Sequence, residues 1–83
     1  MDLKENARIK EAVNQPKHYI GVDGLEAITV MENFLPKYDD AYIGYLVGNV
    51  LKYMLRAPSK DNQTEDFKKA KKYLDMIIQK VEG

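Results

Sequence analysis

The chain has 83 residues, with 13 basic and 13 acidic side chains, one histidine and no cysteine. A chain of this length makes one small domain whose solitary core is marginal, so self-association is expected. Zero cysteines exclude disulfides, thiolate metal sites and a cysteine nucleophile. No apolar run approaches the roughly 18 residues of a membrane span, and the N-terminus lacks the apolar core of a signal peptide, so a cytoplasmic protein is expected.

Charge is distributed unevenly along the chain. Residues 1–40 carry five basic and eight acidic side chains, and residues 41–83 carry eight basic and five acidic ones. A protein that coats nucleic acid normally has a basic excess, so zero net charge argues against a long nucleic acid as partner. The basic second half is where a small anionic ligand is expected.

The sequence divides into a polar N-terminal arm, residues 1–15, and a single helical domain, residues 16–83. The sparse apolar residues of the arm would support at most a short, frayed helix. Pro16, Gly21 and Gly24 predict an ordered turn before the first clear helix.

A first helix is predicted over about residues 25–35, because apolar side chains recur at helical spacing and Pro36 stands just beyond them. These side chains are Leu25, Ile28, Met31 and Leu35. A second helix is predicted over about residues 40–56, where one apolar stripe comprises Ile43, Leu46, Val47, Val50, Leu51 and Met54. The carboxylates of Asp39 and Asp40 are favourable at the positive end of the helix dipole and so indicate the start of that helix. Two adjacent aspartates alone do not predict a magnesium site.

A third helix is predicted to start near Thr64, a plausible N-cap, with acidic residues in its first turn. Its apolar face would comprise Phe67, Ala70, Leu74, Ile77, Ile78 and Val81. No alternating pattern predicts a strand. We therefore expect an all-α, three-helix unit that assembles as a homo-oligomer.

A second stripe follows the second helix beside the apolar one. Its members are Tyr45, Asn49, Lys52, Tyr53 and Arg56. The cations can bind phosphate, the amide can form hydrogen bonds, and the tyrosine rings offer flat surfaces to a base. Gly48, an unfavourable residue in mid-helix, indicates close approach of another backbone or of a ligand. The ordinary alternatives are helix-dipole pairing, tyrosine packing and a tight helix crossing.

Lys69 and Tyr73 share one side of the third helix and extend the candidate site. The lysines around them, with acidic neighbours one turn away, are more typical of a solvated helix face. His18 and Tyr19 lie in the loop after Pro16, where the histidine could contact a ligand or transfer a proton, although a lone loop histidine is more often structural. Because there is no second histidine and no cysteine, no metal site is expected.

Motifs of conventional nucleotide enzymes are missing. The sequence contains neither a GxxxxGK[ST] phosphate loop nor a GxGxxG turn, and neither HExxH nor GxSxG. A common type of ATP-dependent enzyme therefore has no obvious place for its nucleotide, and no catalytic residue or cofactor is predicted.

Four sequence segments occur in an order that resembles a known family. They are PKHY at residues 16–19, GLEAI at 24–28, GNVLKYMLR at 48–56 and EDFKKAKKYL at 65–74, with Lys60 between the last two. Over about residues 14–78 the chain resembles a small phage-encoded family described as a domain of unknown function and as nucleotide-kinase-like. Each motif alone is weak, and their combination in this order is fairly specific.

The resemblance implies a nucleotide ligand. One branch of the family includes a phage deoxynucleoside monophosphate kinase without a conventional phosphate loop or an evident metal requirement. Another resembles anti-CBASS immune-evasion proteins, which are oligomeric sponges that sequester cyclic dinucleotides. The resemblance and the second stripe of the predicted second helix together imply nine ligand-binding residues. They are His18, Tyr19, Tyr45, Asn49, Lys52, Tyr53, Arg56, Lys69 and Tyr73.

Sequestration is favoured over catalysis, because in-line phosphoryl transfer needs two bound nucleotides and strong charge neutralisation, whereas one chain offers three cations near one site. Paired copies in a homo-oligomer, for example a tetramer, suit a ligand with two phosphates and can form a pocket across a subunit interface. The expected protein is a phage sponge for nucleotide immune signals in the cytoplasm of the infected bacterium. A monophosphate kinase and a helical module that inhibits a host factor are the alternatives.

Overall fold

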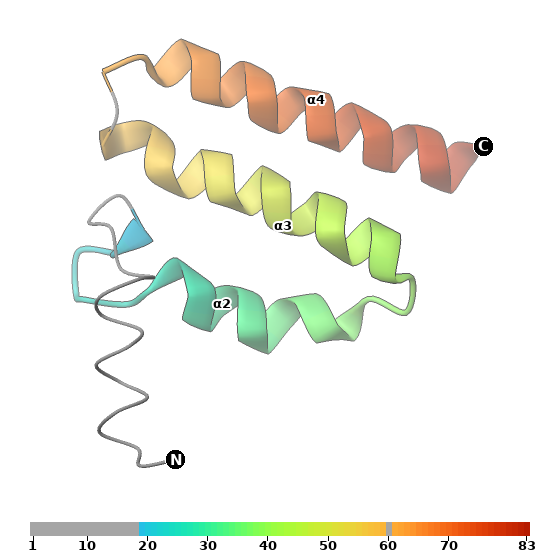
Figure 1. Ribbon diagram of the computed structural model, residues 1–83, viewed down its shortest axis with the longest axis horizontal. Coiled ribbons are helices and arrows are strands. Elements are labelled where there is room, and N and C mark those ends of the chain that lie inside the picture. The colour runs from blue at the N-terminus through green and yellow to red at the C-terminus, as the bar shows by residue number, and fades with distance from the viewer. Residues whose placement is uncertain (1–18, 60) are drawn as a thin grey trace.

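The computed structural model describes residues 19–59 and 61–83. Three α-helices lie side by side in one layer, with α3 between α2 and α4 (Figure 1). They are α2 (Ala27–Phe34), α3 (Ala41–Arg56) and α4 (Gln63–Glu82), and the short 3₁₀ helices η2 (Leu35–Lys37) and η3 (Ala57–Ser59) follow α2 and α3. The predicted all-α, three-helix unit is confirmed, while the predicted arm, residues 1–15, lies outside the described residues.

An ordered turn precedes α2, as the glycines predict. Gly21 donates a backbone hydrogen bond to Leu25 and accepts one from Gly24, whose φ of 84° favours glycine. Ile20 and Glu26 form an isolated antiparallel bridge across this turn. Because the turn extends through Glu26, α2 begins two residues later than predicted.

Helix α3 agrees closely with its prediction, because both of its ends carry strong local signals. Asp40 is the N-cap, and its Oδ1 accepts hydrogen bonds from the backbone amides of Tyr42 at 2.8 Å and Ile43 at 3.2 Å. The helix ends at Arg56, where η3 with Pro58 begins.

Helix α4 begins at Gln63, so the prediction of Thr64 as the N-cap is wrong. Asn62 caps the helix, since its Oδ1 accepts from the backbone amide of Glu65 at 3.1 Å and its Nδ2 donates to the Glu65 carboxylate at 3.2 Å. This reciprocal pair satisfies an amide that the first turn of a helix leaves unbonded. Among the helices of the described ranges, none combines the length and apolar character of a membrane span.

The small core lies mainly between α3 and α4. Leu46 of α3 and Ala57 of η3 are fully buried, and Ala70 of α4 is 3% exposed. Much of the apolar face predicted for α4 is instead exposed, from 45% at Phe67 to 71% at Val81. Helix α4 is rotated so that Asp66 and Ala70 face α3, which leaves those larger side chains uncovered by this single layer.

Gly48 is explained by packing within the chain. A Cβ atom at this position would lie 3.1 Å from Cδ1 of Leu35, the first residue of η2. The close approach inferred from the sequence is therefore made by a leucine side chain.

Candidate functional site

Arg56, the last residue of α3, joins three segments of the chain. Its Nη1 donates to the hydroxyl of Tyr19 at 3.2 Å, and its Nε and Nη2 donate to Oδ1 of Asp66 at 3.3 and 3.2 Å. The hydrogen bonds to Tyr19 and to Asp66 raise the pKa of Arg56 above its ordinary value. Arg56 therefore remains a cation under all ordinary conditions while holding the turn before α2 and the start of α4 together.

Asp66 is the only buried charged residue of the described chain, with 3% exposed. It lies four residues before Ala70, on the side of α4 that faces α3. Its Oδ1 binds Arg56, and its Oδ2 has no hydrogen-bond partner within the part of the chain that the structure describes. A buried carboxylate is tolerated here because the guanidinium neutralises it.

A cluster of cations surrounds the ring of Tyr53. The ring stacks on that of Tyr73 from α4, with centroids 5.9 Å apart and planes 14° apart. The Nζ atoms of Lys52 and Lys69 lie 4.7 and 5.5 Å from the Tyr53 centroid, and Cζ of Arg56 lies 4.9 Å from it. Two helices thus contribute cations to one aromatic surface.

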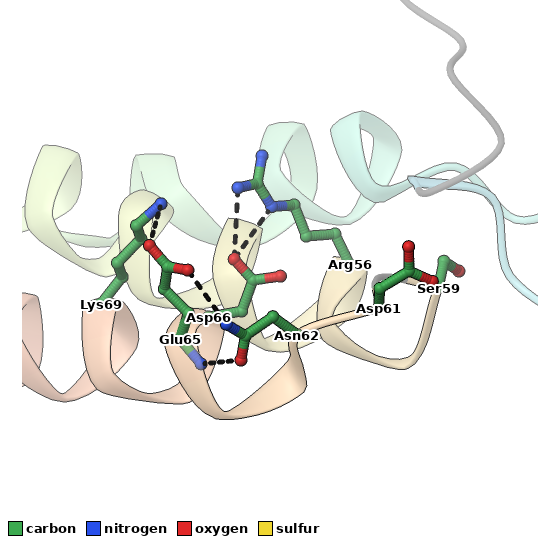
Figure 2. A pocket seen from close by; sticks show the side chains of 7 residues that line it. All are labelled: Arg56, Ser59, Asp61, Asn62, Glu65, Asp66 and Lys69. Atoms are coloured by element: carbon green, nitrogen blue, oxygen red, sulfur yellow. Dashed lines mark hydrogen bonds and ion pairs between the residues drawn. The ribbon is translucent and has the colours of Figure 1, made fainter.

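A polar cavity of about 420 Å³ adjoins this cluster, where η3 leads into α4 (Figure 2). Its lining residues are Arg56, Ser59, Asp61, Asn62, Glu65, Asp66 and Lys69. Two of them, Arg56 and Lys69, also contact the ring of Tyr53. Three carboxylates against two cations make the lining formally negative, although no group of His, Asp or Glu side chains within the described ranges is arranged to hold a metal ion.

Six of the nine predicted ligand-binding residues lie in one cluster: Tyr19, Lys52, Tyr53, Arg56, Lys69 and Tyr73. Tyr45 and Asn49 lie nearer the start of α3. Tyr45 is 59% exposed and stacks on Tyr42, and the Asn49 amide donates to the backbone carbonyl of Tyr45 at 3.0 Å. The ninth residue, His18, lies outside the described residues.

The cavity is also lined by residues outside the predicted site, above all Asp66. Its signal was available, because Asp66, Ala70 and Tyr73 follow each other at helical spacing on one side of α4. A carboxylate on the packed side of a helix needs a cationic partner that neutralises it. Arg56, the last residue of the preceding helix, is such a cation. Ser59 and Asn62 could not be assigned, because their place depends on the path of the connection between α3 and α4.

These features define a small protein made of one layer of helices, with a polar surface of cations, tyrosines and carboxylates at the end of a helical hairpin. The chain belongs to the family DUF3310, whose description is "protein of unknown function" and whose model matches residues 13–75. The resemblance to a family described as a domain of unknown function is thereby confirmed.

Two curated relatives come from bacteriophages. The "Gene 1.7 protein" of Enterobacteria phage T3 is 38% identical over 72 residues, which cover 83% of this chain and 43% of the relative. The "Nucleotide kinase gp1.7" of Escherichia phage T7 is 35% identical over 79 residues, which cover 92% of this chain and 39% of the relative. The chain thus spans about two fifths of the length of these relatives, and no solved structure matches it.

Proposed function

We propose that the chain binds a nucleotide where the cations around Tyr53 meet the polar cavity. The observation that carries the proposal is the position of Lys52, Arg56 and Lys69, all within 5.5 Å of the Tyr53 ring, beside a cavity of about 420 Å³. Small-molecule sites typically have volumes of about 300–1,000 Å³. The name of the phage T7 relative, a nucleotide kinase, supports the same class of ligand.

The charges suggest how a nucleotide would lie. Its phosphate would bind on the Tyr53 side, where Lys52 and Lys69 can donate hydrogen bonds. Arg56 has five N–H groups and uses three of them in hydrogen bonds within the described residues, which leaves two for a phosphate. The carboxylates of Asp61 and Glu65 line the cavity, where they would repel a phosphate and accept hydrogen bonds from sugar hydroxyls or base amino groups. The ligand would therefore point its phosphate away from the cavity floor.

Sequestration without chemical change is the mode that this charge balance favours. Arg56 is bound to Asp66, and Lys69 lies 3.9 Å from the Glu65 carboxylate, so two of the three cations are already partly neutralised. Such a surface suits a bound ground state better than a phosphoryl-transfer transition state, which demands strong charge neutralisation. The proposed role is a phage sponge for a nucleotide immune signal, such as a cyclic dinucleotide, held by a homo-oligomer in the cytoplasm of the infected cell.

Monophosphate phosphorylation is the second candidate, and the name of the phage T7 relative favours it. This chain corresponds to 39% of that relative. A kinase reaction on the present chain would need a nucleoside triphosphate beside the monophosphate, with both held in line.

A melting-temperature panel followed by product analysis tests the proposal. The full chain is heated with mononucleotides, nucleoside triphosphates and cyclic dinucleotides in turn, because a ligand that binds only the folded state raises the melting temperature. A stabilising ligand recovered unchanged from the heated protein would support sequestration. Conversion of dGMP or dTMP plus ATP into a nucleoside diphosphate would establish the kinase instead, and no stabilisation by any nucleotide would overturn the proposal.

A further inference from the structure

The helix layer has an apolar side opposite the candidate site. On α3, Met54 is two residues before Arg56 and therefore lies about 200° from it around the helix axis. On α4, Ile78 is nine residues after Lys69 and lies about 180° from it. Because Arg56 and Lys69 line one cavity, Met54 and Ile78 share the other side of the layer.

Five large side chains form this side, and we call them the apolar face. They are Met54, Phe67, Leu74, Ile78 and Val81, with exposed fractions of 48, 45, 46, 46 and 71%. Together they leave on the order of 500 Å² of apolar surface, whereas the largest patch on a typical monomer is about 300–600 Å². The apolar face lies within that range, so its size alone does not decide its role, but on a chain with so few buried apolar residues it is the natural candidate for an interface.

A groove between α2 and α3 continues the apolar face. It has a volume of about 390 Å³ and lies beside Val47 and Leu51, which are on the Met54 side of α3. Phe34 at the end of α2 also lines the groove and is 56% exposed. The groove therefore offers a mainly apolar lining to side chains from a facing helix.

We propose that the apolar face binds the apolar face of a second copy of this chain. A two-fold pairing would bury this surface from both copies, on the order of 1,000 Å² before the groove is counted, which reaches the roughly 1,000 Å² that a specific interface requires. Because the formal net charge of the chain is zero, two copies experience no net electrostatic repulsion. Two single layers would become a two-layer domain with a shared core.

The segment before Tyr19 is a poorer occupant for this face. The chain enters the described structure at Tyr19, whose hydroxyl contacts Arg56 on the opposite side of the layer. Residues 1–18 contain few large apolar side chains, among them Leu3, Ile9 and Val13. A second copy instead brings a matching apolar area of equal size.

Sedimentation of the full chain over a range of concentrations tests the proposal. The wild-type chain should sediment as a dimer or a larger even assembly, and Ile78→Glu should weaken association at least tenfold. Val22→Glu is the control, since Val22 is fully exposed in the turn before α2 and does not line the groove. A monomer at all concentrations, or equal weakening by both substitutions, would overturn the proposal.

Cysteine cross-linking gives a second readout that does not depend on a destabilising charge. The natural chain has no cysteine, so a single introduced thiol reports one position only. With a flexible bis-maleimide cross-linker, which also joins thiols that lie too far from the two-fold axis for a disulfide, Leu74→Cys or Ile78→Cys should yield a covalent dimer. The Lys72→Cys variant, whose thiol lies on the other side of α4, should run as a monomer on a denaturing gel. Equal cross-linking from Lys72→Cys, or none from either apolar position, would contradict a two-fold pairing through this face.

Discussion

The guanidinium of Arg56 holds one carboxylate oxygen of Asp66 through two nitrogens, at 3.2 and 3.3 Å, and so ties the end of α3 to the first turn of α4. The same guanidinium reaches Tyr19, more than 30 positions earlier in the chain. The pair therefore has a structural role as well as a place in the candidate site. Substitution of Arg56 is for that reason a poor test of binding, and the lysines are better ones.

Asp66→Ala should destabilise the fold. The substitution leaves the Arg56 guanidinium without the carboxylate that neutralises it, and loss of a charged hydrogen-bond partner at a buried position costs about 1–3 kcal/mol. Urea unfolding followed by circular dichroism measures the change. Asp75→Ala is the control, because Asp75 pairs with Lys71 at 2.8 Å on the solvated side of α4, where ion pairs contribute little. Equal losses from both would show that Asp66 is not held as described.

The stability contributed by Arg56 should not change with pH in the neutral range. Its pKa is raised by Tyr19 and Asp66, so its contribution is fully present below the pKa of the unfolded chain and is lost only as the pH rises through the higher folded value. The difference in unfolding free energy between wild type and Arg56→Ala should therefore be the same at about pH 6 and about pH 9, as measured by urea unfolding. A difference that shrinks across this range would contradict a permanently charged Arg56.

Asp40→Ala should cost about 1 kcal/mol of folding free energy, because the Asp40 carboxylate caps two backbone amides at the start of α3. Thermal and urea unfolding both report this loss. Asp39→Ala removes the same charge one residue earlier, where no cap is formed, and should have a much smaller effect. A larger effect at Asp39 would mean that the helix start is stabilised by charge alone.

The two glycines of α3 should respond differently to alanine. A Cβ at Gly44 meets its nearest atoms at an ordinary 3.8 Å, so Gly44→Ala should stabilise the fold by up to about 1 kcal/mol through helix propensity. A Cβ at Gly48 would be 3.1 Å from the Leu35 side chain, so Gly48→Ala should gain less or lose stability. Urea midpoints rank the two variants, and a larger gain at Gly48 would contradict the packing of Leu35.

Tyr45→Ala should leave nucleotide binding unchanged, whereas Tyr73→Ala should weaken it. Tyr45 stacks on Tyr42 and lies eight residues before Tyr53, about 12 Å along the helix axis. Tyr73 supports the Tyr53 ring directly. Fluorescence titration with a stabilising nucleotide compares the variants. Equal loss from Tyr45→Ala would extend the site towards the start of α3, as the sequence stripe predicts.

The helices were predictable where local signals determine them. Helix α3 carries a capping aspartate, a sustained apolar period and Pro58 beyond its end, and all of these act within a few residues. The start of α4 was placed wrongly because Asn62 and Thr64 are both good caps, and the choice depends on the reciprocal bonds between Asn62 and Glu65. The turn at Gly24 likewise delays α2 past Leu25.

The rotation of α4 could not be predicted, because its apolar residues span more than one side. Ala70 faces α3 while Leu74 and Ile78 remain exposed, so a stripe defined by hydrophobicity mixes an intrachain contact with an exposed surface. Spacing did bring Lys52, Tyr53 and Arg56 to one side of α3. The spacing of Asp66 and Ala70 also indicates that Asp66 lies on a packed side of α4, but only the tertiary packing of α3 on α4 shows that Arg56 is its partner.

Isothermal titration calorimetry of nucleotides into the full chain and two charge-matched variants is the most direct test of a nucleotide site at Tyr53. Lys52→Ala/Lys69→Ala removes both lysines around Tyr53, and Lys68→Ala/Lys72→Ala removes two lysines from the solvated side of α4. We predict that the wild-type chain binds at least one mononucleotide or cyclic dinucleotide, that the first variant loses at least tenfold in affinity, and that the second does not. No binding by the wild-type chain, or equal affinity in all three proteins, would contradict a nucleotide site at Tyr53.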